Sequence, residues 1–283
     1  MTWGAFKITL PAKWVLTGEH SVLVGATAVA LPHPSLSLTL EFTPDPSLRS
    51  LVYHPEHTQE ILSQLISELV QTELPSGRLS LMSQIPIGAG MGSSAALCVA
   101  ITQWLAPVLG LARDQIIEFA TQLEHKFHGK SSGMDVAVIA SQMPIAFRRA
   151  QGLSGIQKLE VSNLPRFTFH DTGTRSRTRD CIEKVEKYRR DDPQAAQASD
   201  QRMGQASLIA VDGLRKFHSG EKHEALELLK RAIVDAQACF YDWGLVPQEA
   251  KQLEHELYAQ GALAVKLTGA GGGGMMIALW AES

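Results

Sequence analysis

The sequence predicts an α+β fold, in one large domain or two closely packed smaller ones, and three observations lead to this prediction. Short alternating apolar runs, separated by glycine and proline, occupy residues 1–45, which is typical of β-strands. The stretch Thr178–Gln260 has mostly helical periodicity, and two strand-like runs, Leu263–Leu267 and Met275–Leu279, close the chain. With 283 residues, 45% hydrophobic and 19% charged, the chain can bury a sizeable core.

Apolar periodicity places the remaining elements in order along the chain. Strands are expected at Phe6–Leu10, Val22–Val24, Ala28–Leu31, Leu36–Phe42, Leu79–Ser83, Asp135–Ala140, Ile145–Phe147 and Arg166–His170. Helices are expected at Thr58–Glu73 and Ser94–Leu111, with another after Asp114 as its N-cap. The charged stretch Arg175–Asp200 is expected to be a solvated helix and loop. A division near residue 160 would separate an N-terminal domain, 1–160, from a C-terminal domain, 161–283.

Charge and cysteine content limit the possible partners. The net charge of −3 gives no global attraction to nucleic acid or anionic lipid, so neither partner is expected. The three cysteines are far apart and form no CxxC, which favours a reducing cytoplasm. The N-terminal residues lack the pattern of a signal peptide. The most apolar stretch, Ser94–Ala112, contains Gln103, Pro107 and Gly110, so we expect a buried helix rather than a membrane span.

The strongest local motif is a glycine-rich loop between a predicted strand and a predicted helix. Glycine lets the backbone approach an anion closely, and the N–H groups at a helix start attract phosphate. The loop is neither a Walker A motif nor GxGxxG, and a tight turn with a serine N-cap is the alternative. The residues expected to hold a nucleotide phosphate are Pro86, Gly88, Ala89, Gly90, Met91, Gly92, Ser93 and Ser94.

Two further motifs place charged groups in apolar surroundings. Lys13 and Gly18-Glu19-His20 lie in a region patterned as buried β-structure, where an unpartnered charge is costly. Glu124 and Asp135 flank a glycine-bearing loop that could fold the two carboxylates toward one another, one to hold Mg²⁺ and one to act on a hydroxyl. The alternatives are solvated side chains, or a zinc site at His125 and His128, which lack a nearby third ligand.

A second glycine run, Gly269–Gly274, lies between the two closing strands. Such a run is costly in conformational entropy, so we expect it to approach a ligand or another backbone closely. A flexible hairpin loop is the alternative.

In this order along the chain, the four motifs resemble those of the GHMP kinase superfamily, and within it the mevalonate kinase family. Pro11–His20 is similar to the N-terminal signature, and Pro86–Ala96 to the phosphate loop. The Glu124-to-Asp135 interval matches the mevalonate kinase block, and Gly269–Gly274 the C-terminal glycine motif. The resemblance implies an N-terminal domain like ribosomal protein S5 domain 2 and a ferredoxin-like C-terminal domain.

The resemblance also implies a reaction and a role for each residue. ATP would phosphorylate the primary alcohol of a small-molecule substrate, with Ser94 and Glu124 holding Mg²⁺. Asp135 would accept or orient the alcohol proton. Lys13 would favour the ionised form of the Asp135 carboxylate. The substrate would be bound by Lys13, Glu19, His20, Asp135, Thr178 and Gly271. A homodimer is possible.

The family pattern leaves the acceptor open. His20 favours mevalonate over phosphomevalonate, and Ser21-Val22-Leu23 lacks the Asp-Tyr of galactokinases. The chain departs from the family pattern at Ala12, Ser131 and Ser176, and these departures bear on the expected substrate positioning more than on the expected phosphoryl transfer. The alternatives are phosphomevalonate kinase, another small-alcohol kinase, a decarboxylase of the same fold, or a non-catalytic relative that binds a ligand.

Overall fold

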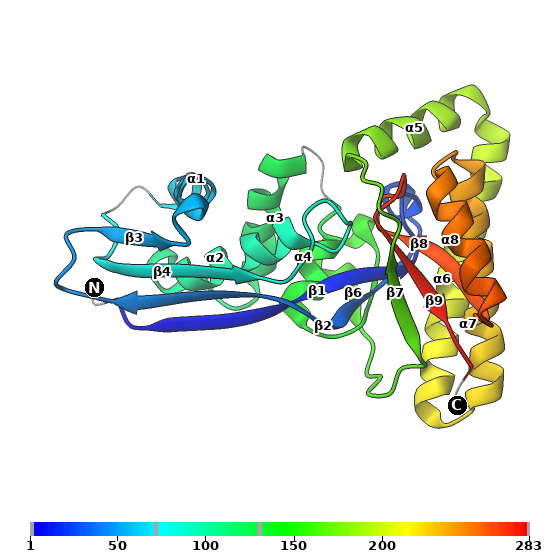
Figure 1. Cartoon of the computed structure of the whole chain (residues 1–283), viewed down its shortest axis with the longest axis horizontal. Helices are drawn as coiled ribbons and strands as arrows, with labels where there is room; N and C mark the ends of the chain where they lie inside the picture. Colours follow the sequence, from blue (N-terminus) through cyan, green and yellow to red (C-terminus); the bar gives the residue numbers. More distant parts are fainter. Residues whose placement is uncertain (1–2, 71–72, 129–131, 282–283) are drawn as a thin grey trace. The chain divides into compact units, whose positions relative to one another are not determined.

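The structure, a computed structural model, describes residues 3–70, 73–128 and 132–281. They form two compact units whose segments alternate along the chain. The first unit consists of the described residues within 1–12, 32–85 and 92–142. The second unit consists of those within 13–31, 86–91 and 143–281. Both units contain helices and strands (Figure 1), so the predicted α+β class is confirmed. The division near residue 160 stays a prediction.

In the first unit, helices pack against strands that form both antiparallel and parallel pairs. Strand β4 pairs antiparallel with β2, in a register running from Leu38↔Ser83 to Pro44↔Gly77, and β3 pairs parallel with β4. The long strands β1 and β2 pair with each other, and each contributes a segment to both units. The elements are β1 (Phe6–Thr17), β2 (Ala28–Pro44), β3 (Leu51–His54), η2 (Glu56–Thr58), α1 (Gln59–Leu69), β4 (Gly77–Ser83), α2 (Ser93–Leu109), α3 (Gln115–His128) and α4 (Met134–Ser141).

Helix α2 lies at the centre of the first unit. Every residue from Ala95 to Thr102 is buried, and α1, α3 and α4 all contact this helix. A helix that is apolar on all sides is stable only when it is enclosed in this way. Trp104 extends the core toward the strands, with its ring centroid 5.4 Å from those of both Phe42 and Trp3. The predicted buried helix at Ser94–Leu111 is therefore confirmed.

The second unit contains a three-stranded antiparallel sheet in the order β7-β9-β8. Helices α7 and α8 contact β8, and α6 packs along α7 (Figure 1). The elements are η1 (Ser21–Val24), β5 (Ile145–Phe147), η3 (Arg149–Gly155), β6 (Ile156–Lys158), β7 (Phe167–Asp171), α5 (Thr178–Asp191), α6 (Pro193–Ser219), α7 (Lys222–Asp242), α8 (Gln248–Ala259), β8 (Ala264–Thr268) and β9 (Met275–Leu279).

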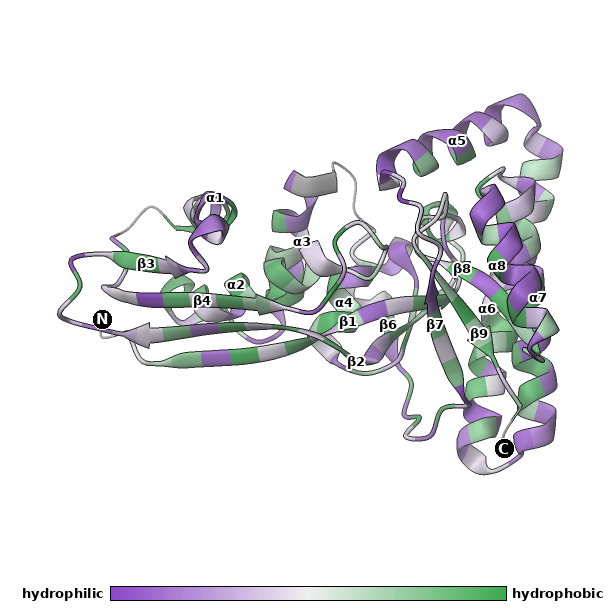
Figure 2. Ribbon diagram, viewed as in Figure 1, coloured by the Kyte–Doolittle hydropathy of each residue, from purple (hydrophilic) through white to green (hydrophobic). Residues whose placement is uncertain are grey.

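Both faces of this sheet are covered. Every residue of β8 and β9 is buried, and Trp14 of β1 packs on β7, with ring centroids 4.9 Å from Phe167 and 5.4 Å from Phe169. Helix α5, in contrast, is mostly hydrophilic (Figure 2), and only Cys181 and Val185 are buried in it. The expected solvated helix in the charged stretch is thus present. Among the described residues, no helix has the length and apolar content needed to span a bilayer.

The strand expected at Asp135–Ala140 is wrong, because these residues belong to helix α4. A short apolar run that is buried on all sides fits a strand or a helix equally well by periodicity. Two local features favour the helix. Gly133 precedes it with φ of 82°, and Asp135 lies in its first turn, where a carboxylate is stabilised by the helix dipole.

Three other expectations near the N-terminus differ from the structure. Val22–Val24 is not a strand but part of the 3₁₀ helix η1, which Gly25 terminates in the left-handed region. Ala28–Leu31 and Leu36–Phe42 are one continuous strand, β2. Pro32 lies outside the stretches of β2 that pair with β5 and β4. The short strands β3 and β6 are additional to those expected from the sequence.

Candidate active site

The predicted phosphate loop passes close to the second glycine run. Gly88 and Gly90 have φ of 73° and 76°, a conformation that favours glycine. A Cβ at Gly90 would lie 3.2 Å from the carbonyl oxygen of Thr268, and one at Gly274 would lie 2.9 Å from that of Ala89. The two loops therefore contact backbone to backbone. This confirms the expectation that Gly269–Gly274 closely approaches another backbone.

Lys13 is joined to the same loop through its main chain. Its N–H donates to the carbonyl oxygen of Met91 at 3.0 Å, and the residue is only 3% exposed. In the second unit, the catalytic lysine predicted from the sequence thus lies beside the predicted phosphate loop.

Helix α2 begins directly after this loop, and glycine supplies its N-cap. Gly92 has φ of 77° and precedes Ser93, the first helical residue. The alternative in which a serine caps the helix is therefore wrong. Ser93 and Ser94 lie in the first turn, where the helix dipole favours an anion.

Glu124 in α3 is a buried carboxylate of the first unit, only 2% exposed. After burial, its charge is the largest cause that raises the pKa of the Cys98 thiol on α2. Cys98 lies four residues after Ser94, so the two share a face of α2. Helices α2 and α3 pack against each other, so Ser94 and Glu124, the two predicted metal ligands, belong to neighbouring helices of the first unit.

Asp135 is the second residue of α4 and is half-buried. Helix α4 contacts both α2 and α3, the helices that carry Ser94 and Glu124. The intervening residues Gly129–Ser131, including the departure at Ser131, lie outside the described residues.

Glu19 forms a buried ion pair with a residue to which the sequence assigned no role. The Lys266 ammonium donates to Glu19 Oε1 at 2.6 Å, and the two side chains are 0% and 3% exposed. Burial raises the pKa of the Glu19 carboxyl and lowers that of the Lys266 ammonium, and each partner opposes the other's shift. The charge of Lys13 acts on both groups.

His20 is fixed in the second unit from both its side chain and its backbone. Its Nε2–H donates to the Ala270 carbonyl oxygen at 2.9 Å, and its ring packs edge-on against Trp243 at 5.2 Å. Its φ is 58°, which is uncommon for a residue other than glycine. Burial lowers the pKa of His20 to about 4, so the ring is neutral at pH 7. A neutral imidazole with Nε2 protonated leaves Nδ1 as an acceptor.

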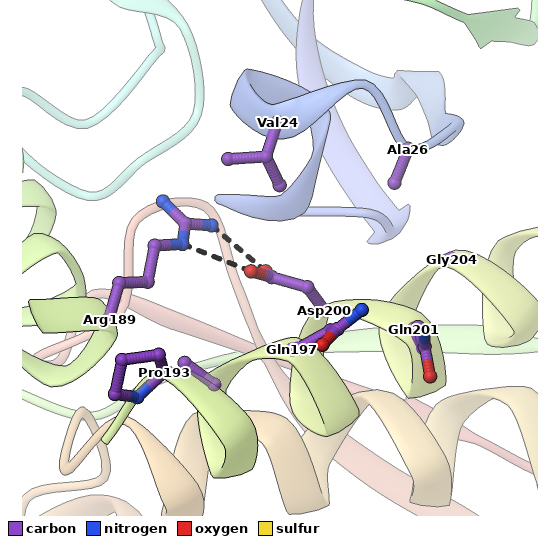
Figure 3. Close-up of a pocket in the computed structure, with 9 residues that line it drawn as sticks. Val24, Ala26, Arg189, Pro193, Gln197, Asp200, Gln201 and Gly204 are labelled. Carbon is purple, nitrogen blue, oxygen red and sulfur yellow. Dashed lines mark hydrogen bonds and ion pairs between the residues drawn. The ribbon is translucent and has the colours of Figure 1, made fainter.

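An ion pair between α5 and α6 supports the backbone after His20. Arg189 donates to Asp200 through Nε at 3.0 Å and Nη2 at 2.9 Å, and also to the His20 carbonyl oxygen at 3.3 Å. Ser21 Oγ donates to Asp200 Oδ1 at 2.6 Å. A cavity of about 470 Å³ opens beside this pair, with Val24 on its other side (Figure 3).

The last two predicted substrate residues lie near the segment that joins β7 to α5. Thr178 is the first residue of α5 and is exposed. Gly271 accepts a hydrogen bond from Ser176 Oγ at 2.7 Å, and a Cβ there would lie 2.9 Å from the Phe240 ring. Ser176, a departure from the family pattern, thus attaches this segment to the glycine run. Ala12, another departure, is fully buried.

Sequence motifs therefore identified most of these residues but not the side chains that hold them. In the second unit, Lys13, Glu19, His20 and the loop residues up to Met91 come together around the second glycine run. Lys266 and the Arg189–Asp200 pair were missed. The only sequence signal for Lys266 was a charged residue in an apolar strand next to a glycine motif.

Comparison with known proteins identifies relatives over nearly the whole chain. Residues 58–142 match the model of the GHMP kinases N terminal domain. The chain is 34% identical to a mevalonate kinase of Aeropyrum pernix, over 98% of this chain and 89% of the relative.

Solved structures share the fold at lower identity. The mevalonate kinase of L. major in complex with R-mevalonate has a TM-score of 0.79 at 23% identity, covering 98% of this chain and 88% of that one. A phosphomevalonate kinase of Streptococcus pneumoniae has a TM-score of 0.74 at 18% identity, covering 99% and 92%. The fold alone therefore does not select the acceptor. The near-complete match to the Aeropyrum pernix relative shows that the chain belongs to the mevalonate kinase family of the GHMP kinase superfamily.

Proposed function

We propose that this chain transfers the γ-phosphoryl group of ATP to the primary hydroxyl of mevalonate, giving 5-phosphomevalonate and ADP. The observation that carries the proposal is the contact between the two glycine-rich loops, with Lys13 bound to the first of them. Closely approaching glycine backbones offer N–H groups to an anion without side chains in the way. The relatives named mevalonate kinase support this acceptor.

Each residue has a distinct task in the proposed reaction. The backbone of Gly88–Ser94 cradles the nucleotide phosphates. Asp135 orients the acceptor hydroxyl and takes its proton as the oxygen attacks phosphorus, and Lys13 offsets the negative charge that then develops. His20 and Thr178 contact the acceptor.

The first unit contains donors that fit Mg²⁺. Magnesium prefers hard oxygen ligands, which the Ser94 hydroxyl and the Glu124 carboxylate provide. A buried carboxylate such as Glu124 is also stabilised by a nearby cation. Magnesium bound there would neutralise charge on the phosphates during transfer.

An acceptor panel tests the proposal. ADP release is measured with mevalonate, phosphomevalonate, homoserine and galactose, each with ATP and Mg²⁺. We expect the highest kcat/KM with mevalonate. A preference for phosphomevalonate would assign the chain to the next kinase step, and release of carbon dioxide would assign it to a decarboxylase. Absence of turnover with all four would favour a non-catalytic relative.

Assembly and location complete the proposal. We propose a cytoplasmic location. The three cysteines of the chain are free and buried, which fits the reducing cytoplasm expected from the sequence. We also propose a homodimer, which light scattering after size-exclusion chromatography would detect as twice the mass of one chain.

A further inference from the structure

Lys266 is a fully buried cation that the proposed reaction does not use. It lies in β8, at 0% exposure. Its ammonium contacts Glu19 Oε1 at 2.6 Å and the Val15 carbonyl oxygen at 3.3 Å, and it lies 5.2 Å from the Phe240 ring centroid. These groups all belong to the second unit.

Stability alone does not explain why two charges are buried here. Removing two ions from water costs about as much as their attraction returns, so an apolar pair of similar size is often equally stable. Variants that lose only one partner are strongly destabilised, because the other charge is then buried and unpaired. A charged pair does offer directional contacts that apolar side chains lack.

The pair lies where strand β8 is attached to strand β1 and to the segment that follows it. Thr268 Oγ1 accepts from the Val15 N–H at 2.8 Å and donates to the Val15 carbonyl at 3.0 Å. His20 donates to Ala270, just beyond β8. Lys266 therefore makes one of three side-chain attachments between β1–His20 and β8–Ala270, alongside those of Thr268 and His20.

Lys13 and His20, two residues of the proposed reaction, lie on either side of this attachment. Lys13 is two residues before Val15, so their side chains point to the same face of β1. Glu19 directly precedes His20, whose unusual φ requires support from its surroundings. Displacing Glu19 would therefore disturb His20 directly, and would disturb the Lys13 segment of β1 through Lys266, whose ammonium also donates to the Val15 carbonyl oxygen.

We propose that the Glu19–Lys266 pair positions Lys13 and His20 for phosphoryl transfer, and that Lys266 is a positioning residue of the enzyme. The inference rests on the proposed kinase function. It also assigns Glu19 an internal contact, in place of the substrate contact that the family resemblance implies.

A double-mutant cycle separates positioning from stability. The variants are Lys266→Met, Glu19→Gln and the double variant Glu19→Gln/Lys266→Met, which removes both charges at similar volume. Val265→Ala is the matched control, because it creates a cavity at the neighbouring buried position of β8 without touching the pair. Tm, kcat and both KM values are measured for each, well below its Tm.

We expect both single variants to have a lower Tm and the double variant to regain most of it. The kcat of the double variant should stay roughly 10–100-fold below wild type, because displacement of about 1 Å has effects of this size. Val265→Ala should lose Tm and keep its kcat. A double variant with wild-type Tm and wild-type kcat would overturn the proposal, since the pair would then be only structural.

If the double variant does not fold, the variant Glu19→Asp tests the positioning role instead. It keeps both charges and withdraws the carboxylate by one methylene, so we expect a folded protein with kcat reduced at least roughly tenfold. A wild-type kcat in this variant would contradict positioning. All rates are measured with whichever acceptor the wild-type chain phosphorylates, so a wrong acceptor is not mistaken for a failure of positioning.

Discussion

Loss of the Asp135 side chain is expected to slow the proposed reaction more than loss of any other single side chain. It lies in the first turn of α4, where replacing a carboxylate costs the helix little. We expect Asp135→Ala to remain folded and to lower kcat on the order of 10²–10⁴-fold, the usual effect of losing a general base. Glu118→Ala, which removes an exposed acid from the first turn of α3, is the control and should keep full turnover. Near-normal turnover of the Asp135 variant would refute its role.

Ser94 tests the proposed magnesium site. Ser94→Ala removes a hydroxyl from the start of α2 without removing an N-cap, because Gly92 holds that position. We expect the Mg²⁺ concentration for half-maximal rate to rise roughly tenfold, as metal sites respond to loss of a supporting group. The KM for the acceptor should not change. A magnesium titration identical to that of wild type would exclude Ser94 as a ligand.

His20 makes the stability of the protein depend on pH. Its pKa is about 4 in the folded protein against 6.5 when exposed, so the unfolded chain takes up a proton first as pH falls. Stability is therefore lost as pH falls below about 6.5. Between pH 7.5 and 5, wild type should lose about 2 kcal/mol more free energy of unfolding than His20→Gln.

Urea denaturation of both proteins at the two pH values measures this difference. His33 and His170, whose pKa values burial also lowers, are present in both proteins and cancel. The charged neighbours of His20 that oppose or add to the shift are Arg189, Asp200 and Glu186. Equal losses in the two proteins would show that His20 is not buried in its neutral form.

The sequence predicted the reactive residues better than their surroundings. Lys13, Glu19 and His20 stand out because charge is rare in buried β-structure. Their partners could not be found in this way, because Glu19 and Lys266 are 247 positions apart. Contacts this distant depend on the fold, which local patterns do not contain.

At the scale of elements, length and surroundings decided which predictions were correct. The long apolar helix α2 and the strands β5 and β9 agree with the sequence pattern. Helix α4 has only eight residues and is buried, so its periodicity carried little information. Strand β2 continues through Pro32 and Pro34, a residue type that often ends a strand, and both lie between the stretches that pair with β5 and β4.

The second glycine run should tolerate even alanine poorly. A Cβ at Gly271 would lie 2.9 Å from Phe240 and 3.0 Å from Leu245, whereas Gly220 has a similar positive φ and open space around it. We expect Gly220→Ala to cost about 1–2 kcal/mol from backbone strain. Gly271→Ala should cost roughly 1–3 kcal/mol more, from overpacking.

Chemical denaturation of these two variants separates backbone strain from close packing. Because both glycines have a left-handed conformation, their difference reports the space around Gly271 alone. Equal losses of unfolding free energy would mean that the loop moves away from α7 without cost.

At the scale of the whole molecule, the segments of the two compact units alternate along the sequence. Lys13 and Pro86–Met91 belong to one unit, while Ser94, Glu124 and Asp135 belong to the other. Local sequence patterns identified each motif. No local pattern in the sequence shows that the segments of the two units alternate. The reaction itself rests on the family, whose shared fold serves more than one acceptor.

The most direct test of the proposed reaction is ³¹P NMR of its products. The wild-type chain is incubated with ATP, Mg²⁺ and mevalonate, with Asp135→Ala as the matched negative control. We predict one new phosphomonoester signal, formed in equal amount to ADP by wild type and far more slowly by the variant. ADP without a phosphomonoester, or a diphosphate formed only when phosphomevalonate is supplied, would contradict the assignment of mevalonate as the acceptor.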